Sequence, residues 1–154
     1  MTDQRTQDQM IRYVIVSDGA QVAEGKLFIL GGGITTLWGA QAPVQHGQLS
    51  FAIRVDVPWK ATTPAEHVLT LDIINVDGQS ILQVKPEVRF EAGRPPGMRS
   101  EDVQTMNLAL NLLGITFPEF GKYKVVCSMD GTPEVEEPLH VLPAPVTPGQ
   151  PPQG

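Results

Sequence analysis

The sequence has one cysteine, Cys127, among its 154 residues. A lone cysteine cannot form an intrachain disulfide or a multi-cysteine metal site, so cysteine usage does not point to an oxidising compartment. No stretch reaches the roughly 18 to 20 apolar residues that span a bilayer, and residues 1–9 lack the basic and apolar pattern of a signal peptide. We therefore expect a cytoplasmic protein that has no membrane partner.

Basic residues are also few. Eleven Lys and Arg stand against seventeen Asp and Glu, which gives a net charge of −6. An acidic surface repels a phosphate backbone unless its basic residues gather on one face, so nucleic acid is not an expected partner. Charged residues make up 18% of the chain, and the surface must rely on uncharged polar residues, Gly and Pro, as is common in β-rich folds.

Polar and proline-rich segments mark the two ends of the chain. Residues 1–9 are almost wholly polar and are interpreted as a flexible arm. Residues 143–154 contain five prolines, and proline lacks the N–H that helices and sheets need, so this segment is predicted to be a disordered tail. Residues 10–142 are long enough for a single domain with its own hydrophobic core.

Alternation of apolar and polar residues is the strongest local pattern between these ends. It places every second side chain on one face of a strand, so that one face packs in the core and the other meets water. Pro86 marks the alternating segment 82–91 as an edge or bulged strand. The four alternating segments are 49–57, 82–91, 105–112 and 122–129. Further strands are predicted at 10–17, 26–30, 33–38, 66–76 and 135–142, with a bulge near Ile73.

Glycine-containing turns separate these nine predicted strands, and helical patterns are almost absent. The single helical candidate is one turn at 100–105, capped by Ser100. Short strands without intervening helices predict an all-β fold, a two-sheet antiparallel sandwich of about nine strands. The predicted turns are Asp18-Gly19, Gly31–Gly33, Asp77-Gly78, 93–97 and Asp130-Gly131.

The segment Phe117–Gly131 resembles the late hairpin of immunoglobulin-like and C2-like sandwiches, because a Gly-x-Tyr opens a strand that ends in an Asp-Gly turn. Together with 13–18 and 25–33, it resembles a family of small bacterial β-sandwich proteins of unknown function, over residues 11–142. The resemblance implies a sandwich in which Tyr123 anchors a corner through its hydroxyl, and it implies no catalytic residues. The chain lacks the paired cysteines of immunoglobulin domains.

Residues capable of chemistry are present but do not form a recognised motif. Gly31–Gly33 is followed by a strand pattern rather than a helix, so it is interpreted as a turn and not as a phosphate cradle. Cys127 shares the inward phase of its strand and is assigned to the core. We therefore predict no catalytic, cofactor-binding or metal-binding residues. The other candidates considered are His46, His67 and His140, which lack metal-motif spacing, and Asp18, Asp77 and Asp130, each of which precedes a glycine.

Two kinds of surface feature are compatible with binding. The loop 93–100 carries Arg94 and Arg99, which can grip a carboxylate or phosphate, together with Met98. Trp38 and Trp59 lie near strand ends, where an aromatic ring can pack, rim an interface or stack on a sugar.

The function expected from these features is a non-enzymatic protein-interaction or structural module without a cofactor. Its partner is expected to be another protein or a second copy of the chain, bound through a sheet edge, the 93–100 loop or the tail. The alternatives are a ligand-binding sandwich for carbohydrate or Ca²⁺, and a hydrolase built on a sandwich, which requires His, Asp or Cys groups that converge in one pocket.

Overall fold

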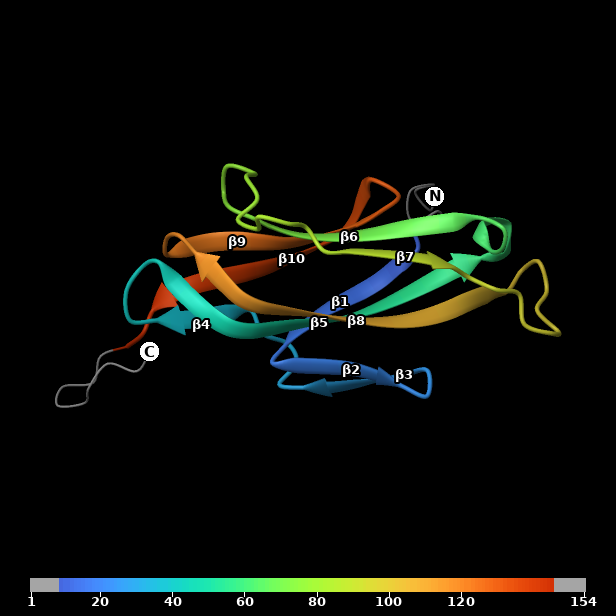
Figure 1. The fold of residues 1–154 in the computed structure, drawn as a ribbon, viewed down its shortest axis with the longest axis horizontal. Helices are drawn as coiled ribbons and strands as arrows, with labels where there is room; N and C mark the ends of the chain where they lie inside the picture. Colours follow the sequence, from blue (N-terminus) through green and yellow to red (C-terminus); the bar gives the residue numbers. More distant parts are fainter. Residues whose placement is uncertain (1–8, 146–154) are drawn as a thin grey trace, which may run out of the picture.

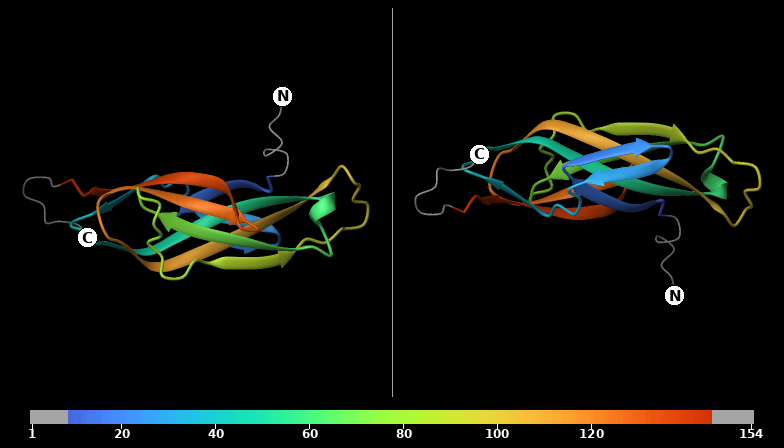
Figure 2. Two further views of the ribbon diagram at one scale, coloured as in Figure 1. Left: turned by 90° about the horizontal axis from the view of Figure 1, so that it is seen from above. Right: turned by 90° about the horizontal axis from the view of Figure 1, so that it is seen from below.

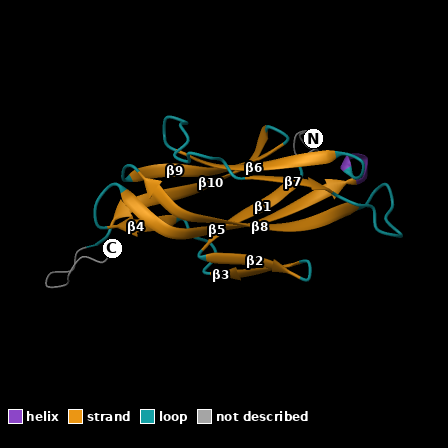
Figure 3. Cartoon of the chain, viewed as in Figure 1, coloured by secondary structure: helices purple, strands orange, loops and turns teal. Residues whose placement is uncertain are grey.

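The computed structural model describes residues 9–145, so the predicted arm at 1–9 and tail at 143–154 lie almost entirely outside the described residues. Within 9–145 the chain is built from strands and one short 3₁₀ helix, and no helix there is long and apolar enough to cross a membrane (Figures 1 and 3). The elements are β1 (Ile11–Ser17), β2 (Gly19–Ala23), β3 (Lys26–Leu30), β4 (Thr36–Gly39), β5 (Val44–Pro58), η1 (Trp59–Ala61), β6 (Glu66–Ile74), β7 (Glu87–Glu91), β8 (Val103–Phe117), β9 (Gly121–Met129) and β10 (Thr132–Pro143).

Two sheets stack face to face, which confirms the predicted two-sheet sandwich (Figure 1). The three-stranded sheet has the order β1-β5-β8, and the five-stranded sheet has the order β4-β10-β9-β6-β7. All neighbours are antiparallel except β4 and β10, which run parallel, with Thr36 opposite His140 and Gly39 opposite Pro143. The last strand therefore reaches Pro143, one residue beyond the predicted end of the domain.

The core between the sheets follows the predicted alternation. The inward side chains of β5, among them Phe51 and Ile53, are fully buried, and they face the equally buried Leu69, Leu71 and Ile73 of β6. Each such side chain contributes about 1.5–3 kcal/mol by leaving water. Burial of the inward side chains that the alternation places on one face of each strand thus holds the two sheets together.

A hairpin forms a third layer that the sequence pattern did not predict. Strands β2 and β3 pair only with each other and lie on the outer face of the three-stranded sheet (Figures 1 and 2). Their turn is Glu24-Gly25, in which both residues have positive φ, +52° and +73°, as two-residue hairpin turns require. Asp18-Gly19 is therefore not a tight turn but the bend at which the chain leaves the sheet for this hairpin.

Three further local predictions are wrong. The pairing of β6 with β9 continues without a shift through Ile73 and Ile74, so there is no bulge there; the strand simply ends. The alternating segment 82–91 is a strand only from Glu87, because Pro86 has no N–H for the ladder, although β7 is an edge strand as expected. The predicted helical turn at 100–105 is a short turn, in which the Asp102 carboxylate accepts the Arg99 N–H at 2.8 Å, and β8 begins at Val103.

Candidate interaction surfaces

The β2–β3 hairpin is fastened to the sandwich by amide side chains. Asn107 on β8 donates from Nδ2 to the Gly25 carbonyl oxygen at 2.8 Å, and Gln48 on β5 donates from Nε2 to the Asp18 carbonyl oxygen at 3.3 Å. Beneath the hairpin, the outward positions of β5 and β8 hold Ala52, which is fully buried, and its register partner Ala109. Small side chains at two outward positions let another layer approach, and they are the signal in the sequence from which this layer could have been predicted.

Strand β3 turns one face of this hairpin to solvent. Leu27 and Ile29 are half-buried, whereas Phe28 and Leu30 are 56% and 76% exposed. A shallow hollow of about 400 Å³ adjoins them; it is lined by uncharged residues of three elements, Gly19, Ala20, Gln21, Gln48 and Asn111. The hairpin therefore presents two neighbouring large apolar side chains beside uncharged hydrogen-bonding groups, and sequence reasoning did not single out either side chain.

The predicted site residues Arg94 and Trp59 lie in contact. The Arg94 guanidinium stacks over the Trp59 ring at 3.9 Å from its centroid. Arg94 also donates from Nε to Thr62 Oγ1 at 2.6 Å and from Nη2 to the Trp59 carbonyl oxygen at 3.0 Å. These contacts join the 93–100 loop to η1, so most of the binding capacity of Arg94 is directed at its own chain.

Arg99 and Met98, in the same loop, have other neighbours. The Arg99 side chain is 74% exposed, and its Nε lies 3.3 Å from Glu101 and 3.9 Å from Asp102. Met98 is half-buried, and its N–H bonds to the Pro95 carbonyl oxygen at 3.1 Å. Each arginine of the loop thus has its own partners, and most of the Arg99 side chain lies in solvent.

Trp38 lies far from Trp59. It is 56% exposed on β4, where it pairs with Leu142 of β10. Strand β4 lies at one end of the long axis and η1, which carries Trp59, lies near the other (Figure 1). The two tryptophans therefore do not form a shared platform.

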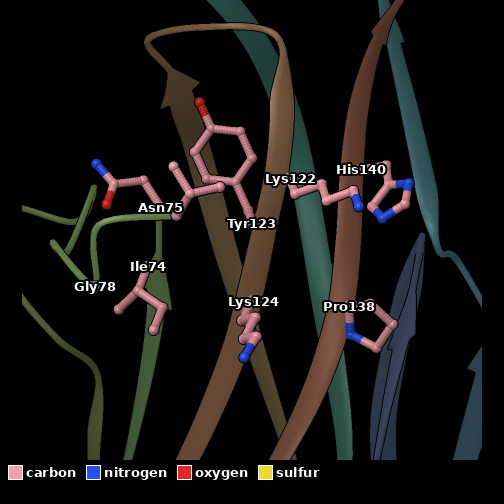
Figure 4. Close-up of a pocket in the computed structure, with 9 residues that line it drawn as sticks. Ile74, Asn75, Gly78, Lys122, Tyr123, Lys124, Pro138 and His140 are labelled. Atoms are coloured by element: carbon pink, nitrogen blue, oxygen red, sulfur yellow. The ribbon is translucent and has the colours of Figure 1, made fainter.

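A second hollow, of about 370 Å³, lies on the outer face of the five-stranded sheet (Figure 4). Lys122 and Lys124 enter it from β9 and His140 from β10, with Asn75 at its rim. The Lys124 Nζ lies 3.4 Å from Glu136. Two amines and an imidazole therefore border this hollow, and one of the amines is already paired.

Tyr123 has the structural role that the resemblance implied. Its hydroxyl donates to the Glu119 carbonyl oxygen at 2.6 Å and accepts the Glu119 N–H at 3.2 Å. Its ring is buried and meets Phe117 edge to face, with ring centroids 5.1 Å apart. Tyr123 therefore anchors the connection between β8 and β9.

His67 and Asp130 form the one ion pair with a buried histidine in the described part of the chain. His67 Nδ1 lies 2.7 Å from Asp130 Oδ2, and His67 Nε2 lies 2.6 Å from the Ala61 carbonyl oxygen. Burial lowers the pKa of His67, but the Ala61 carbonyl and the Asp130 carboxylate outweigh it and raise the pKa above its ordinary value. Because Nε2 faces a carbonyl oxygen, the ring has no nucleophile to activate.

The Asp56 carboxylate forms a second charged cluster, on the outer face of the three-stranded sheet. Arg12 and Arg54 approach it at 3.2 and 3.1 Å, and Thr105 donates to it at 2.8 Å. Burial raises the pKa of Asp56, but the bonds from Thr105 and the arginines dominate and lower it. All three partners come from different strands, so the cluster joins β1, β5 and β8.

Metal and thiol chemistry find little support in residues 9–145. No three His, Cys, Asp or Glu side chains gather there in a way that holds a metal ion, and Asp18, Asp77 and Asp130 occupy three separate connections. Cys127 is buried in the core as predicted; burial, and then the charge of Glu134, raises the pKa of its thiol to about 12.

The fold and these surfaces define a small β-sandwich with an added hairpin layer. The chain belongs to the family of unknown function DUF6941, whose model matches residues 12–142. This match covers nearly the same residues as the resemblance noted in the sequence. No curated protein matches the chain.

Solved structures give weaker likenesses. An alkylpurine DNA glycosylase from Pseudomonas fluorescens aligns at 8% identity over 88% of this chain and 30% of its own, with a TM-score of 0.43. A β-glucuronidase of glycoside hydrolase family 2 aligns at 15% identity over 65% of this chain and 10% of its own, with a TM-score of 0.39. An immunoglobulin-like protein from Pseudomonas aeruginosa aligns at 16% identity over 84% of this chain and 96% of its own, with a TM-score of 0.32. This chain thus spans less than a third of the two enzymes, and the sandwich assignment rests on its own sheets.

Proposed function

We propose that this protein is a non-enzymatic interaction module that binds another protein in the cytoplasm through its β2–β3 hairpin. The observation that carries the proposal is the exposure of Phe28 and Leu30, two residues apart on one face of β3. Neighbouring large apolar side chains on a surface mark interaction sites more often than scattered single ones do. Aromatic residues, Phe among them, are also enriched at protein–protein interfaces.

The geometry of the hairpin supports this proposal. Its inner face is fixed to the sandwich by Asn107 and Gln48, so Phe28 and Leu30 are held on a firm support rather than on a loose loop. The hollow beside them offers the amide of Gln21 as an uncharged hydrogen-bonding group, whereas the Asn111 amide already accepts from Ser50 Oγ and donates to the Ala20 carbonyl oxygen. A partner would bury the two apolar side chains and bond to the Gln21 amide, which is the usual combination of apolar centre and polar rim.

The other functions considered have less support. A sugar platform needs neighbouring aromatic rings, whereas Trp38 and Trp59 lie near opposite ends of the molecule. A hydrolase needs a base that faces a nucleophile, whereas both nitrogens of His67 face acceptors of its own fold. A Ca²⁺ site needs several oxygens around one point, and the three Asp-Gly aspartates belong to separate connections.

The proposal is tested with a hairpin variant and a matched control. The variant is Phe28→Ser with Leu30→Ser, and the control is Val76→Ser, because Val76 is 76% exposed, as Leu30 is, but lies in the connection after β6. Each full-length protein is used as bait in its source cells, and co-purified proteins are quantified by mass spectrometry. The strongest candidate is then purified and titrated against all three baits.

We expect the control to bind the purified partner as the wild type does, and the hairpin variant to bind at least about 30-fold more weakly, since a central anchor contributes about 2 kcal/mol or more. If every partner that binds the wild type binds the hairpin variant equally well, the hairpin is not the binding surface and the proposal is wrong.

A further inference from the structure

The edge strands of the two main sheets differ in whether they carry features that block pairing with another strand. An edge strand presents unpaired N–H and C=O groups, and proteins commonly block such edges with charge, proline, bulges or short strands. In the described part of the chain, the edge strands of the two main sheets are β1, β8, β4 and β7. Three of these four edges carry such devices.

The edge of β1 is covered by other parts of the chain. Glu134 Oε1 accepts the N–H groups of Met10 and Ile11 at 2.9 and 2.8 Å. At the other end of the strand, the Val16 carbonyl oxygen accepts the N–H groups of Gly33 and Ile34 at 2.9 and 3.0 Å. A register shift between Ile11 and Tyr13 interrupts the strand as well. This edge is therefore closed to a partner strand.

The edges of the five-stranded sheet are short or charged. Strand β4 has four residues, Thr36–Gly39. Strand β7 has five, preceded by Pro86, and three of them are Glu87, Arg89 and Glu91. Arg89 lies 3.3 Å from Glu66 and 3.7 Å from Glu87, so the charges also form pairs along this edge. Neither edge is suited to pairing with another strand.

Strand β8 has none of these devices. It runs for fifteen residues, and it is the only strand longer than five residues in the described chain that has no Asp, Glu, Lys or Arg; it also lacks proline. It pairs with β5 on one side, and no strand within residues 9–145 pairs with its other side. Gly114, with φ of +64°, is the one interruption, which leaves Val103–Leu113 as a regular edge.

The sandwich is also incompletely closed along this edge. The inward side chains of β8, Met106, Leu108, Leu110 and Leu112, are only half-buried, whereas their register partners on β5 are fully buried. On the facing sheet, Val88 and Phe90 of β7 are half-buried too. Strands β7 and β8 lie along the same long side of the molecule (Figure 2). A row of apolar side chains therefore remains partly in water behind an unblocked edge.

We propose that the edge of β8 pairs antiparallel with β8 of a second copy of this chain, which joins two three-stranded sheets into one six-stranded sheet. The lack of charge on β8 suits a second copy as the occupant: each copy carries −6, and an uncharged strand is the contact at which two such copies repel each other least. A strand adapted to a different protein, in contrast, gains rate and specificity from complementary charge.

The sequence of β8 is compatible with pairing to itself. A twofold axis at Leu108, the centre of the regular edge, places Met106 opposite Leu110 and Gln104 opposite Leu112 of the second copy. On the other face it places Asn107 opposite Ala109, and Thr105 opposite Asn111. Inward residues thus meet inward residues, and outward residues, all of them uncharged, meet outward residues. The half-buried apolar row therefore becomes continuous across the axis.

The experiment measures the mass of the full chain in solution by sedimentation velocity, from micromolar to millimolar concentration. The test variant is Leu108→Lys, and the matched control is Val88→Lys, because Val88 is also an inward, half-buried residue of an edge strand. We expect a dimer for the wild type and for Val88→Lys. In Leu108→Lys two like charges meet at the axis, so the dissociation constant rises at least about 100-fold. Circular dichroism confirms that both variants are folded.

Hydrogen exchange of the wild type provides a second measurement that needs no variant. We expect amides within Val103–Leu113 to become more protected at high concentration, where the dimer forms. A wild type that remains monomeric at millimolar concentration overturns the proposal, and so does a dimer whose protection lies outside β8.

The hairpin variant separates this inference from the proposed function. Phe28→Ser with Leu30→Ser should leave the dimer intact, because the hairpin strands are not part of the β8 edge. If that variant abolishes the dimer, the self-association surface is the hairpin and the assignment to β8 is overturned. Loss of partner binding with an intact dimer supports both proposals at once.

Discussion

The Asp130 carboxylate serves two strands at one end of the sandwich. Asp130 itself begins the turn between β9 and β10, with φ of +52°. Its Oδ1 accepts the Val68 N–H at 2.9 Å, and its Oδ2 lies 2.7 Å from His67 Nδ1. Because His67 also faces the Ala61 carbonyl oxygen, both ring nitrogens face acceptors and the protonated ring is favoured. The Asp-Gly turn predicted from sequence thus also forms an ion pair with His67. The sequence alone does not show this pair, because His67 lies 63 positions earlier in the chain.

This arrangement predicts a pH-dependent stability. The folded state raises the pKa of His67 above 6.5, so its stabilisation is fully present below pH 6.5 and is lost as the pH rises through the folded pKa. We expect the free energy of unfolding in urea to fall from pH 6 toward pH 9. His67→Phe should remove this dependence, since it keeps an apolar ring next to Phe90 but carries no proton. An unchanged pH profile in that variant would assign the dependence to other groups.

Arg94 shows where reasoning from residue types runs out. The sequence marked Arg94 and Trp59 separately as candidates for binding, and their chemistry suits a stacked pair. Their contact depends on the path of the chain between η1 and the 93–100 loop, which no local pattern encodes. The same applies to Phe28, which is exposed because its neighbours Leu27 and Ile29 face the sheet, a choice of faces that depends on where the hairpin docks.

Strand β4 docks through a glycine. A Cβ added to Gly39 would lie 2.6 and 2.7 Å from the two methyl carbons of Val44, a buried core residue, and 3.2 Å from its Cβ. Gly39 also accepts the Ala144 N–H at 2.8 Å through its carbonyl oxygen. The absence of a side chain at this position therefore allows the last pairing of β4 to lie close to β5.

We predict that Gly39→Ala destabilises the fold by about 1–3 kcal/mol, because Val44 must move within a packed core. Gly47→Ala is the matched control: a Cβ there meets nothing within 4 Å, and the change should shift stability by less than about 1 kcal/mol. Urea unfolding of the two variants beside the wild type measures both values. Equal stability of the two variants would show that Val44 accommodates the methyl group without loss.

Most strands were predictable from sequence, whereas strand β2 and the layer it forms were not. Strands β5, β8 and β9 follow clean alternation over many residues, and their inward faces are those that the pattern assigned. Strand β3 has the predicted bounds, 26–30. Strand β4 has four residues and overlaps the predicted strand 33–38, and strand β2 has five residues with little alternation and was not predicted. Tertiary contacts determine the positions of both β2 and β4. Strand β2 packs over β5 and β8, where Ala52 and Ala109 lie, and β4 pairs with β10, about a hundred positions further along the chain.

Cys127 provides a reporter for the opening of the whole molecule. It is fully buried between the sheets, and its thiol has a pKa of about 12, so neither access nor ionisation favours reaction in the folded state. We predict that iodoacetamide at pH 8 modifies it only through global unfolding. The rate should increase in Gly39→Ala by about tenfold for each 1.4 kcal/mol of lost stability, and it should reach that of a free thiol in urea. A native rate that is the same in wild type and variant would indicate a local opening near β9.

The parallel pairing of β10 with β4, together with the capping of β1 by Glu134, has a consequence for the time course of folding. The strands nearest the amino terminus receive these contacts from the last strand of the described chain, over separations of more than a hundred residues. Closure of such long loops makes a fold slow to form, commonly in milliseconds to seconds. On the ribosome, the β1 edge must therefore wait uncovered until β10 has been synthesised, which is when a newly made chain is most exposed to chaperones and proteases.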